Sequence, residues 1–278
     1  MRNASINAVS ILNASTELTL RVASPWMGVL WLTALPHRLL QFYFIGQLGI
    51  LMEPQHYVNY LWRLSAIVFS AFVVSLYGRA VFVRACHLAE SSTRDSRFEP
   101  LKVPLSDFVP YVYTALINEF FFYLTSFTMI MFPVFMIYGG LAAATSYGIG
   151  GPKLLDAPLK AIKAASSWRS LLALSIVFLF GTIMALINLF VLIEIALALG
   201  GQVLGSALPR WEYIFQPGWM SLFPKQPLTN SLMLIGATLI IEPFWLAANV
   251  DMIQKARARK SGVDLQLWFH DIKSEAAK

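Results

Sequence analysis

The 278-residue chain is 57% hydrophobic and only 13% charged, and its 21 Lys+Arg against 15 Asp+Glu give a net charge of +6. A soluble domain carries about 25% charged residues, so this composition excludes an ordinary soluble protein. The basic residues form short clusters beside apolar runs. Lipid headgroups are therefore the expected contact, and nucleic acid is not.

Apolar runs long enough to cross ~30 Å of hydrocarbon, about 20 residues each, predict the membrane spans. The first run is interrupted by Pro36-His37-Arg38. In chain order the spans are expected at 25–51, 57–85, 108–131, 133–148, 171–199 and 228–250.

The conformation of the segment 108–147 determines whether the chain has six spans or five. At 1.5 Å per residue the segment makes about 60 Å of helix, twice the thickness of the hydrocarbon. A turn at Pro133 would give two spans, and a kink there would give one. With six spans, 16 basic residues share the side of both termini and 2 lie opposite, whereas five spans divide them almost evenly. Because Lys and Arg stay cytoplasmic, six spans in the inner membrane with both termini in the cytoplasm are favoured, and five are the alternative.

Two further segments have apolar residues at helical spacing with basic residues off the stripe. They predict amphipathic helices on the inner membrane surface at about 154–166 and 263–273. The expected fold class is therefore an all-α integral membrane protein, a six-span helical bundle with amphipathic surface helices. It forms a single polytopic domain over 1–278.

Ionisable side chains inside a span are costly and mark functional sites by default. Polar residues recur at helical spacing on the second, third and last predicted spans, where they favour other helices or water over lipid. The candidate intramembrane polar site comprises Arg63, Asn118, Glu119, Glu242 and Asn249. One interpretation is a polar path or pocket between helices. The other is structural, with Arg63 paired to Glu119 or Glu242 and the asparagines bonded to neighbouring helices.

No motif for catalysis, for a cofactor or for a metal is recognisable. The four histidines lie in unlike surroundings, and the chain has no His-Glu-x-x-His, Gly-x-Ser-x-Gly or P-loop sequence. The single cysteine, Cys86, excludes an intrachain disulfide and a cysteine-based metal cluster, and an inert thiol is expected. The expectation is a protein that is not an enzyme and has no cofactor.

The second half of the chain has a characteristic order of segments. Phe132-Pro133 leads a short apolar stretch, Ala-Pro-Leu-Lys-Ala-Ile-Lys at 157–163 precedes a span, and Glu-Pro-Phe-Trp-Leu-Ala-Ala-Asn at 242–249 precedes a basic run and Gly-Val-Asp-Leu at 262–265. This order resembles polytopic bacterial membrane proteins related to the membrane domain of glycerophosphodiester phosphodiesterases. Ser261 stands where their tail carries glutamate. In the phosphodiesterases a separate soluble domain does the chemistry, so the resemblance implies a membrane domain without catalytic residues.

These observations predict a non-catalytic integral membrane component, a scaffold or accessory subunit of an envelope assembly. Its expected partners are the lipid bilayer and other membrane proteins. The alternative is a small transporter or lipid-handling protein that uses the intramembrane Arg, Glu and Asn residues.

Overall fold

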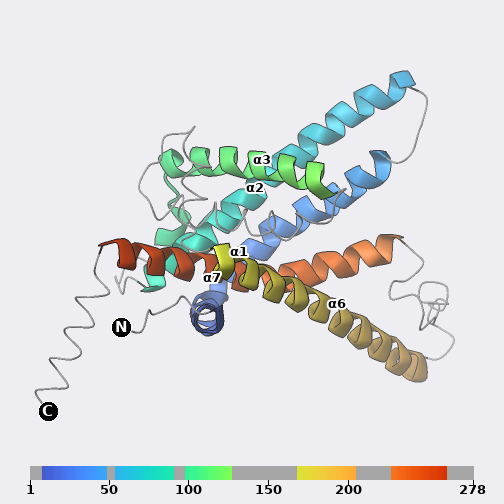
Figure 1. Ribbon diagram of the computed structural model, residues 1–278. Helices are drawn as coiled ribbons and strands as arrows, with labels where there is room; N and C mark the ends of the chain where they lie inside the picture. Colours follow the sequence, from blue (N-terminus) through green and yellow to red (C-terminus); the bar gives the residue numbers. More distant parts are fainter. Residues whose placement is uncertain (1–7, 49–53, 91–97, 127–167, 205–226, 262–278) are drawn as a thin grey trace, which may run out of the picture. The chain divides into compact units, whose positions relative to one another are not determined.

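The computed structural model describes residues 8–48, 54–90, 98–126, 168–204 and 227–261 (Figure 1). Within these ranges the chain is helical and has no strand, which confirms the predicted all-α class. The elements are α1 (Ala8–Leu48), α2 (Pro54–Glu90), the short 3₁₀ turn η1 (Glu99–Leu101), α3 (Leu105–Ser126), α6 (Trp168–Leu204) and α7 (Pro227–Ser261).

Four of these helices are long and apolar enough to cross a membrane. The qualifying segments are Val9–Gln41, Asn59–Ala89, Ile176–Ile193 and Leu232–Met252. They overlap the first, second, fifth and sixth predicted spans, as expected for an integral membrane protein.

The remaining predicted spans and surface helices are covered only in part. The third predicted span begins within α3, whose apolar part Leu105–Ile117 is shorter than a full span. The fourth span (133–148) and the two amphipathic helices (154–166 and 263–273) lie outside the described residues. Six spans therefore stay a prediction.

The first helix differs from its prediction in both its start and its break. It begins at Ala8 rather than near residue 25, and its non-helical residue is Ser24 (φ −111°, ψ 126°) rather than Pro36-His37-Arg38. Ser24 precedes Pro25, and a residue before proline is disfavoured in the α region. Pro36 removes only one backbone donor, a loss that an apolar helix tolerates.

The polar residues at the start of α1 are compatible with a helix because they bond within it. The buried Ser15 hydroxyl donates to the Leu12 carbonyl (2.8 Å), and the buried Thr19 hydroxyl donates to the Ser15 carbonyl (2.7 Å). Hydroxyls that donate one turn back can be buried without another partner. This local bonding extends α1 well beyond the apolar run that predicted it.

The described helices divide into two compact units. Unit 1 comprises Met1–Leu30, Leu76–Val177 and Pro243–Lys278, and unit 2 comprises Trp31–Ser75 and Phe178–Glu242. The chain passes from one unit to the other within α1, α2, α6 and α7. Each of the four long helices therefore contributes to both units.

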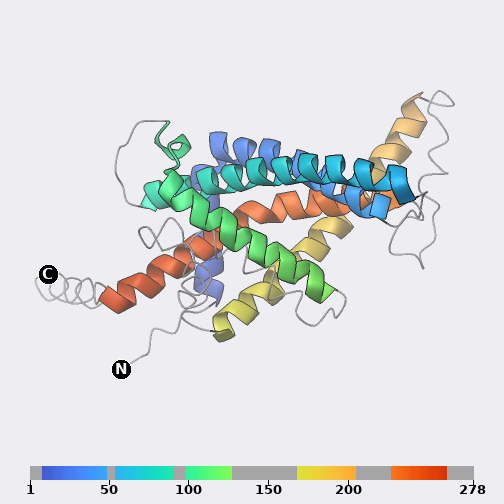
Figure 2. The same ribbon diagram turned by 90° about the horizontal axis from the view of Figure 1, so that it is seen from above.

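In unit 1 the C-terminal part of α2 is enclosed on all sides. Ala80, Val81, Phe82 and Val83 are consecutive and fully buried, and Cys86 is fully buried one turn later. α3 begins beside this part of α2, as Figures 1 and 2 both show. A helix that is apolar all round belongs inside a packed core. The burial of Cys86 agrees with the expected inert thiol.

In unit 2, α6 and α7 approach each other at glycines. A Cβ added at Gly181 would lie 3.5 Å from Ile241 Cδ1, and one added at Gly236 would lie only 3.2 Å from Leu189 Cδ1. Small residues allow such close packing between membrane helices. Elsewhere α6 is open, since only 11% of Ile176–Ile193 is buried. Apolar surface of this extent requires lipid or another apolar partner.

Candidate functional site

The five residues of the predicted polar site do not form one described cluster. Arg63 lies on α2 and Glu242 on α7 in unit 2, whereas Asn249 lies further along α7 in unit 1. Asn118 and Glu119 belong to α3 in unit 1, and their side chains lie outside the described residues. A site that uses all five stays a prediction.

The three described side chains of this set differ in environment. Arg63 is exposed, Glu242 is half-buried, and Asn249 is buried. Asn249 Nδ2 donates to the Trp245 carbonyl of its own helix (2.9 Å), so this bond is made within α7 and not to a neighbouring helix. Among the described ion pairs none joins Arg63 to Glu242.

Glu242 is the residue of this set with the clearest functional position. It is the central residue of the 21-residue span Leu232–Met252 and immediately precedes Pro243. At 1.5 Å per residue it lies about 15 Å from either end of that span, which in a bilayer with ~30 Å of hydrocarbon would place it at the middle. A carboxyl group at this depth is costly and is a functional candidate by default.

Pro243 creates a second polar feature at the same level of α7. Proline has no backbone N–H, so the carbonyl four residues earlier, that of Leu239, loses its helical donor. The indole Nε1 of Trp31 in α1 donates to this carbonyl at 2.8 Å. A neighbouring helix thus satisfies the backbone group that the proline frees, which is how membrane helices accommodate proline.

The sequence reading did not identify the role of Trp31. A signal for it exists, because a proline within an apolar run predicts an unsatisfied carbonyl four residues before it. The partner could not be chosen from the sequence, since Trp31 and Leu239 are 208 residues apart.

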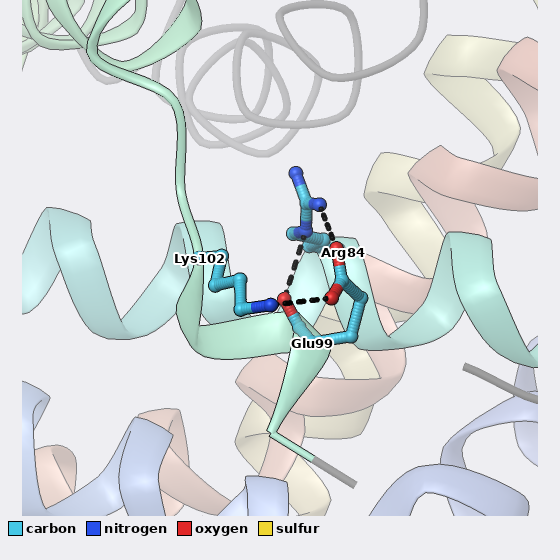
Figure 3. Close-up of polar contacts among 3 residues, drawn as sticks. All are labelled: Arg84, Glu99 and Lys102. Atoms are coloured by element: carbon cyan, nitrogen blue, oxygen red, sulfur yellow. Dashed lines mark hydrogen bonds and ion pairs between the residues drawn. The ribbon is translucent and has the colours of Figure 1, made fainter. Parts of the chain in front are cut away.

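A charged cluster joins α2 to η1 in unit 1. Arg84 Nη2 donates to Glu99 Oε1 (3.0 Å), Arg84 Nε donates to the Glu99 backbone carbonyl (3.2 Å), and Lys102 Nζ lies 3.2 Å from Glu99 Oε2. Figure 3 shows the Glu99 carboxylate between the two cations. The hydrogen bond and charge of Lys102, and then those of Arg84, lower the pKa of Glu99, although partial burial opposes the shift.

The cluster predicts that the connection between α2 and η1 weakens in acid. A carboxyl whose folded pKa is depressed stabilises the fold above its unfolded pKa, and this contribution is lost as the pH falls through the folded pKa. We expect the hydrogen-exchange protection factors of residues 98–104, corrected for the intrinsic pH dependence of amide exchange, to be high at pH 7 and to fall once the pH drops below the usual carboxyl value of 4.5. Glu99→Gln should show low protection at both pH values.

Glu17→Gln is the matched control for this prediction, because Glu17 pairs with Arg21 one turn away on the exposed surface of α1. Such exposed pairs contribute little. Lower protection of residues 98–104 at pH 7 in Glu17→Gln than in the native chain, or unchanged protection there in Glu99→Gln, would contradict the assignment.

A further polar contact joins α2 to α7 in unit 1. Gln254 Nε2 lies 3.0 Å from His87 Nδ1, and Lys255 Nζ donates to Asp251 Oδ2 at 2.7 Å. Asp251 is buried, so its charge requires the partner that Lys255 provides. The Gln254–His87 contact joins the C-terminal part of α7 to the end of α2, whereas the Lys255–Asp251 pair lies within α7.

The described residues were compared with the arrangement that a metal site requires. In the part of the chain that the structure describes, no group of three His, Cys, Asp or Glu side chains is placed to hold a metal ion. Several described polar side chains bond within their own helices, and others join two helices or form the Arg84–Glu99–Lys102 cluster. Comparison with protein-family models, with curated proteins and with solved structures finds no match.

Proposed function

We propose that the protein is a non-catalytic integral membrane component, a scaffold or accessory subunit of an envelope assembly. The observation that carries this proposal is that polar side chains within the spans bond to carbonyls of their own helices. The side chains of Ser70, Thr114, Thr182, Asn188 and Asn249 each donate to a carbonyl four residues back in their own helix. The donor groups bonded in this way are already occupied within their own helices, so they need no further partner from a substrate path.

The exposed apolar surface of α6 supports the same proposal. Ile176, Phe180, Ile183 and Ile187 lie exposed along one side of the helix. In a membrane such a surface contacts lipid, and it is also available for packing against another membrane protein. A subunit of an assembly needs this kind of surface.

The proposed topology has six spans and both termini in the cytoplasm of the inner membrane. The basic residues expected on that side, Arg21, Arg84, Lys102 and Lys255, all belong to unit 1. α2 runs from unit 2 into unit 1, and α6 runs from unit 1 into unit 2. The resemblance to the membrane domain of the phosphodiesterases is in keeping with the proposal.

The test is affinity purification of the tagged chain in mild detergent, with quantitative mass spectrometry against an untagged control. We expect a reproducible stoichiometric membrane-protein partner. Glu242→Gln should keep both the partner and the abundance of the protein, because a scaffold does not depend on that charge. A monodisperse chain that emerges alone with a defined lipid or small molecule would contradict the proposal.

A transporter or lipid-handling protein is the second candidate function, and one observation favours it. Glu242 stands at the centre of a span beside a proline, and interrupted helices at the midplane are typical of transporter binding sites. If this candidate is right, Glu242→Gln abolishes uptake or lipid transfer while the protein remains folded and abundant. Equal loss of abundance and activity would instead indicate a structural role for Glu242.

A further inference from the structure

The connector between α2 and α3 is fixed along the side of α2. The Tyr77 hydroxyl donates to the Leu101 carbonyl (2.8 Å), and Arg84 binds both the carboxylate and the carbonyl of Glu99. Pro100 is buried. The connector therefore lies at the level of α2 between Tyr77 and Arg84.

This level can be compared with the thickness of a bilayer. Trp62, with 77% of its surface exposed, marks the opposite end of the span Asn59–Ala89, since exposed tryptophans gather at headgroup level. Along α2, Tyr77 follows Trp62 by about 22 Å and Arg84 by about 33 Å. The hydrocarbon is ~30 Å thick. The connector is thus at the boundary between hydrocarbon and headgroups.

The outward surface of the connector is apolar with one cation. Phe98 is 67% exposed and Leu105 is 75% exposed, and Leu101 between them is also exposed. The side chain of Lys102 is 71% exposed. Apolar side chains beside a long basic one suit the boundary, where the apolar groups enter lipid and the ammonium group reaches the headgroups.

Several polar groups of the connector are satisfied internally, as that depth requires. The Leu101 carbonyl accepts from Tyr77, and the amide of Lys102 donates to the Glu99 carbonyl at 3.1 Å. The Glu99 carboxylate is compensated by Arg84 and Lys102. Backbone and charge satisfied in this way can lie in a region of low dielectric.

We propose that residues 98–105 form a phospholipid-binding surface, in which Phe98, Leu101 and Leu105 insert into the bilayer interface beside the C-terminal part of α2. The occupant is the phospholipid bilayer itself. Because Glu99 balances one of its two neighbouring cations, the surface does not require an anionic lipid. The inference rests on the membrane span assigned to α2 and not on the identity of any partner.

The test uses the full chain with Cys86→Ala, reconstituted in phosphatidylcholine vesicles. Single-cysteine variants Phe98→Cys, Leu105→Cys, Lys102→Cys and Val74→Cys are labelled with an environment-sensitive fluorophore. Labels at 98 and 105 should be quenched several-fold more by lipids brominated on the upper acyl chain than by aqueous iodide. The label at 102 should show the reverse preference.

Quenching of the label at Val74 shows whether a negative result overturns only the proposed surface or also the span assigned to α2. Val74 is exposed on α2 about 18 Å from Trp62, well inside the expected hydrocarbon. Quenching at 74 by brominated lipid, with iodide quenching at 98 and 105, would overturn the surface alone. Iodide quenching at 74 would overturn the span and the surface together. Each labelled variant must elute monodisperse, and Phe98 and Leu105 are exposed enough to tolerate the change.

Discussion

Trp31→Phe is expected to lower the free energy of unfolding by about 1–3 kcal/mol, the usual cost of leaving a low-dielectric polar group without its partner. The substitution keeps an aromatic ring but removes the indole N–H, which donates to the Leu239 carbonyl. That carbonyl has no helical donor, because its usual donor position is Pro243. Reversible unfolding of the purified protein in mixed detergent micelles measures the loss.

Pro243→Ala supplies the second half of a double-mutant cycle. Alanine restores a backbone N–H, so the Leu239 carbonyl regains a donor within α7. In this background Trp31→Phe should cost much less than in the native chain. Trp62→Phe is the matched control, since Trp62 is exposed and should be near neutral in both backgrounds. Equal costs of Trp31→Phe with and without Pro243 would show that the bond to Leu239 is not what Trp31 contributes.

Gly236→Leu is expected to destabilise the protein by about 1–3 kcal/mol through overpacking between α6 and α7. A Cβ at position 236 would lie 3.2 Å from Leu189 Cδ1, tighter than an ordinary contact, so a leucine there requires Leu189 to move. Gly28→Leu is the control, because nothing lies within 4 Å of a Cβ at that position of α1. The same unfolding measurement should place Gly28→Leu near or above the native stability, since leucine is a better helix former than glycine.

A smaller loss of stability on substitution of Gly181 than of Gly236 would support this packing further. Gly181 faces Ile241 at 3.5 Å, an ordinary contact distance, so Gly181→Ala should cost little. If Gly236→Leu and Gly28→Leu were equally tolerated, close approach of α6 and α7 at Gly236 would be refuted.

The helices that the sequence predicted well are those that depend only on length and apolar composition. α2, α6 and α7 contain the runs expected at 57–85, 171–199 and 228–250. α1 begins before the run expected at 25–51, and in its earlier part Ser15 and Thr19 bond to their own helix. These side-chain bonds are local, but a search for apolar runs does not detect them.

The candidate site was less accessible to prediction, because it depends on which helices meet. Glu242 was identified from its charge within a span, and that reasoning needs no partner. The donor for the Leu239 carbonyl comes from α1, and the connector is fixed by Arg84, which the sequence showed only as one of several basic residues near a span end. Contacts between residues distant in the chain are set by tertiary packing and leave no periodic signal.

The central claim is that α2 crosses the inner membrane with its Trp62 end outside and its Arg84 end in the cytoplasm. Trp62→Cys and Lys102→Cys, each in the Cys86→Ala background, test it by labelling intact cells with a membrane-impermeant maleimide. The proposed topology predicts that position 62 is labelled in intact cells and position 102 only after the membrane is opened. Labelling at position 102 in intact cells, or protection of position 62 until the membrane is opened, would contradict it.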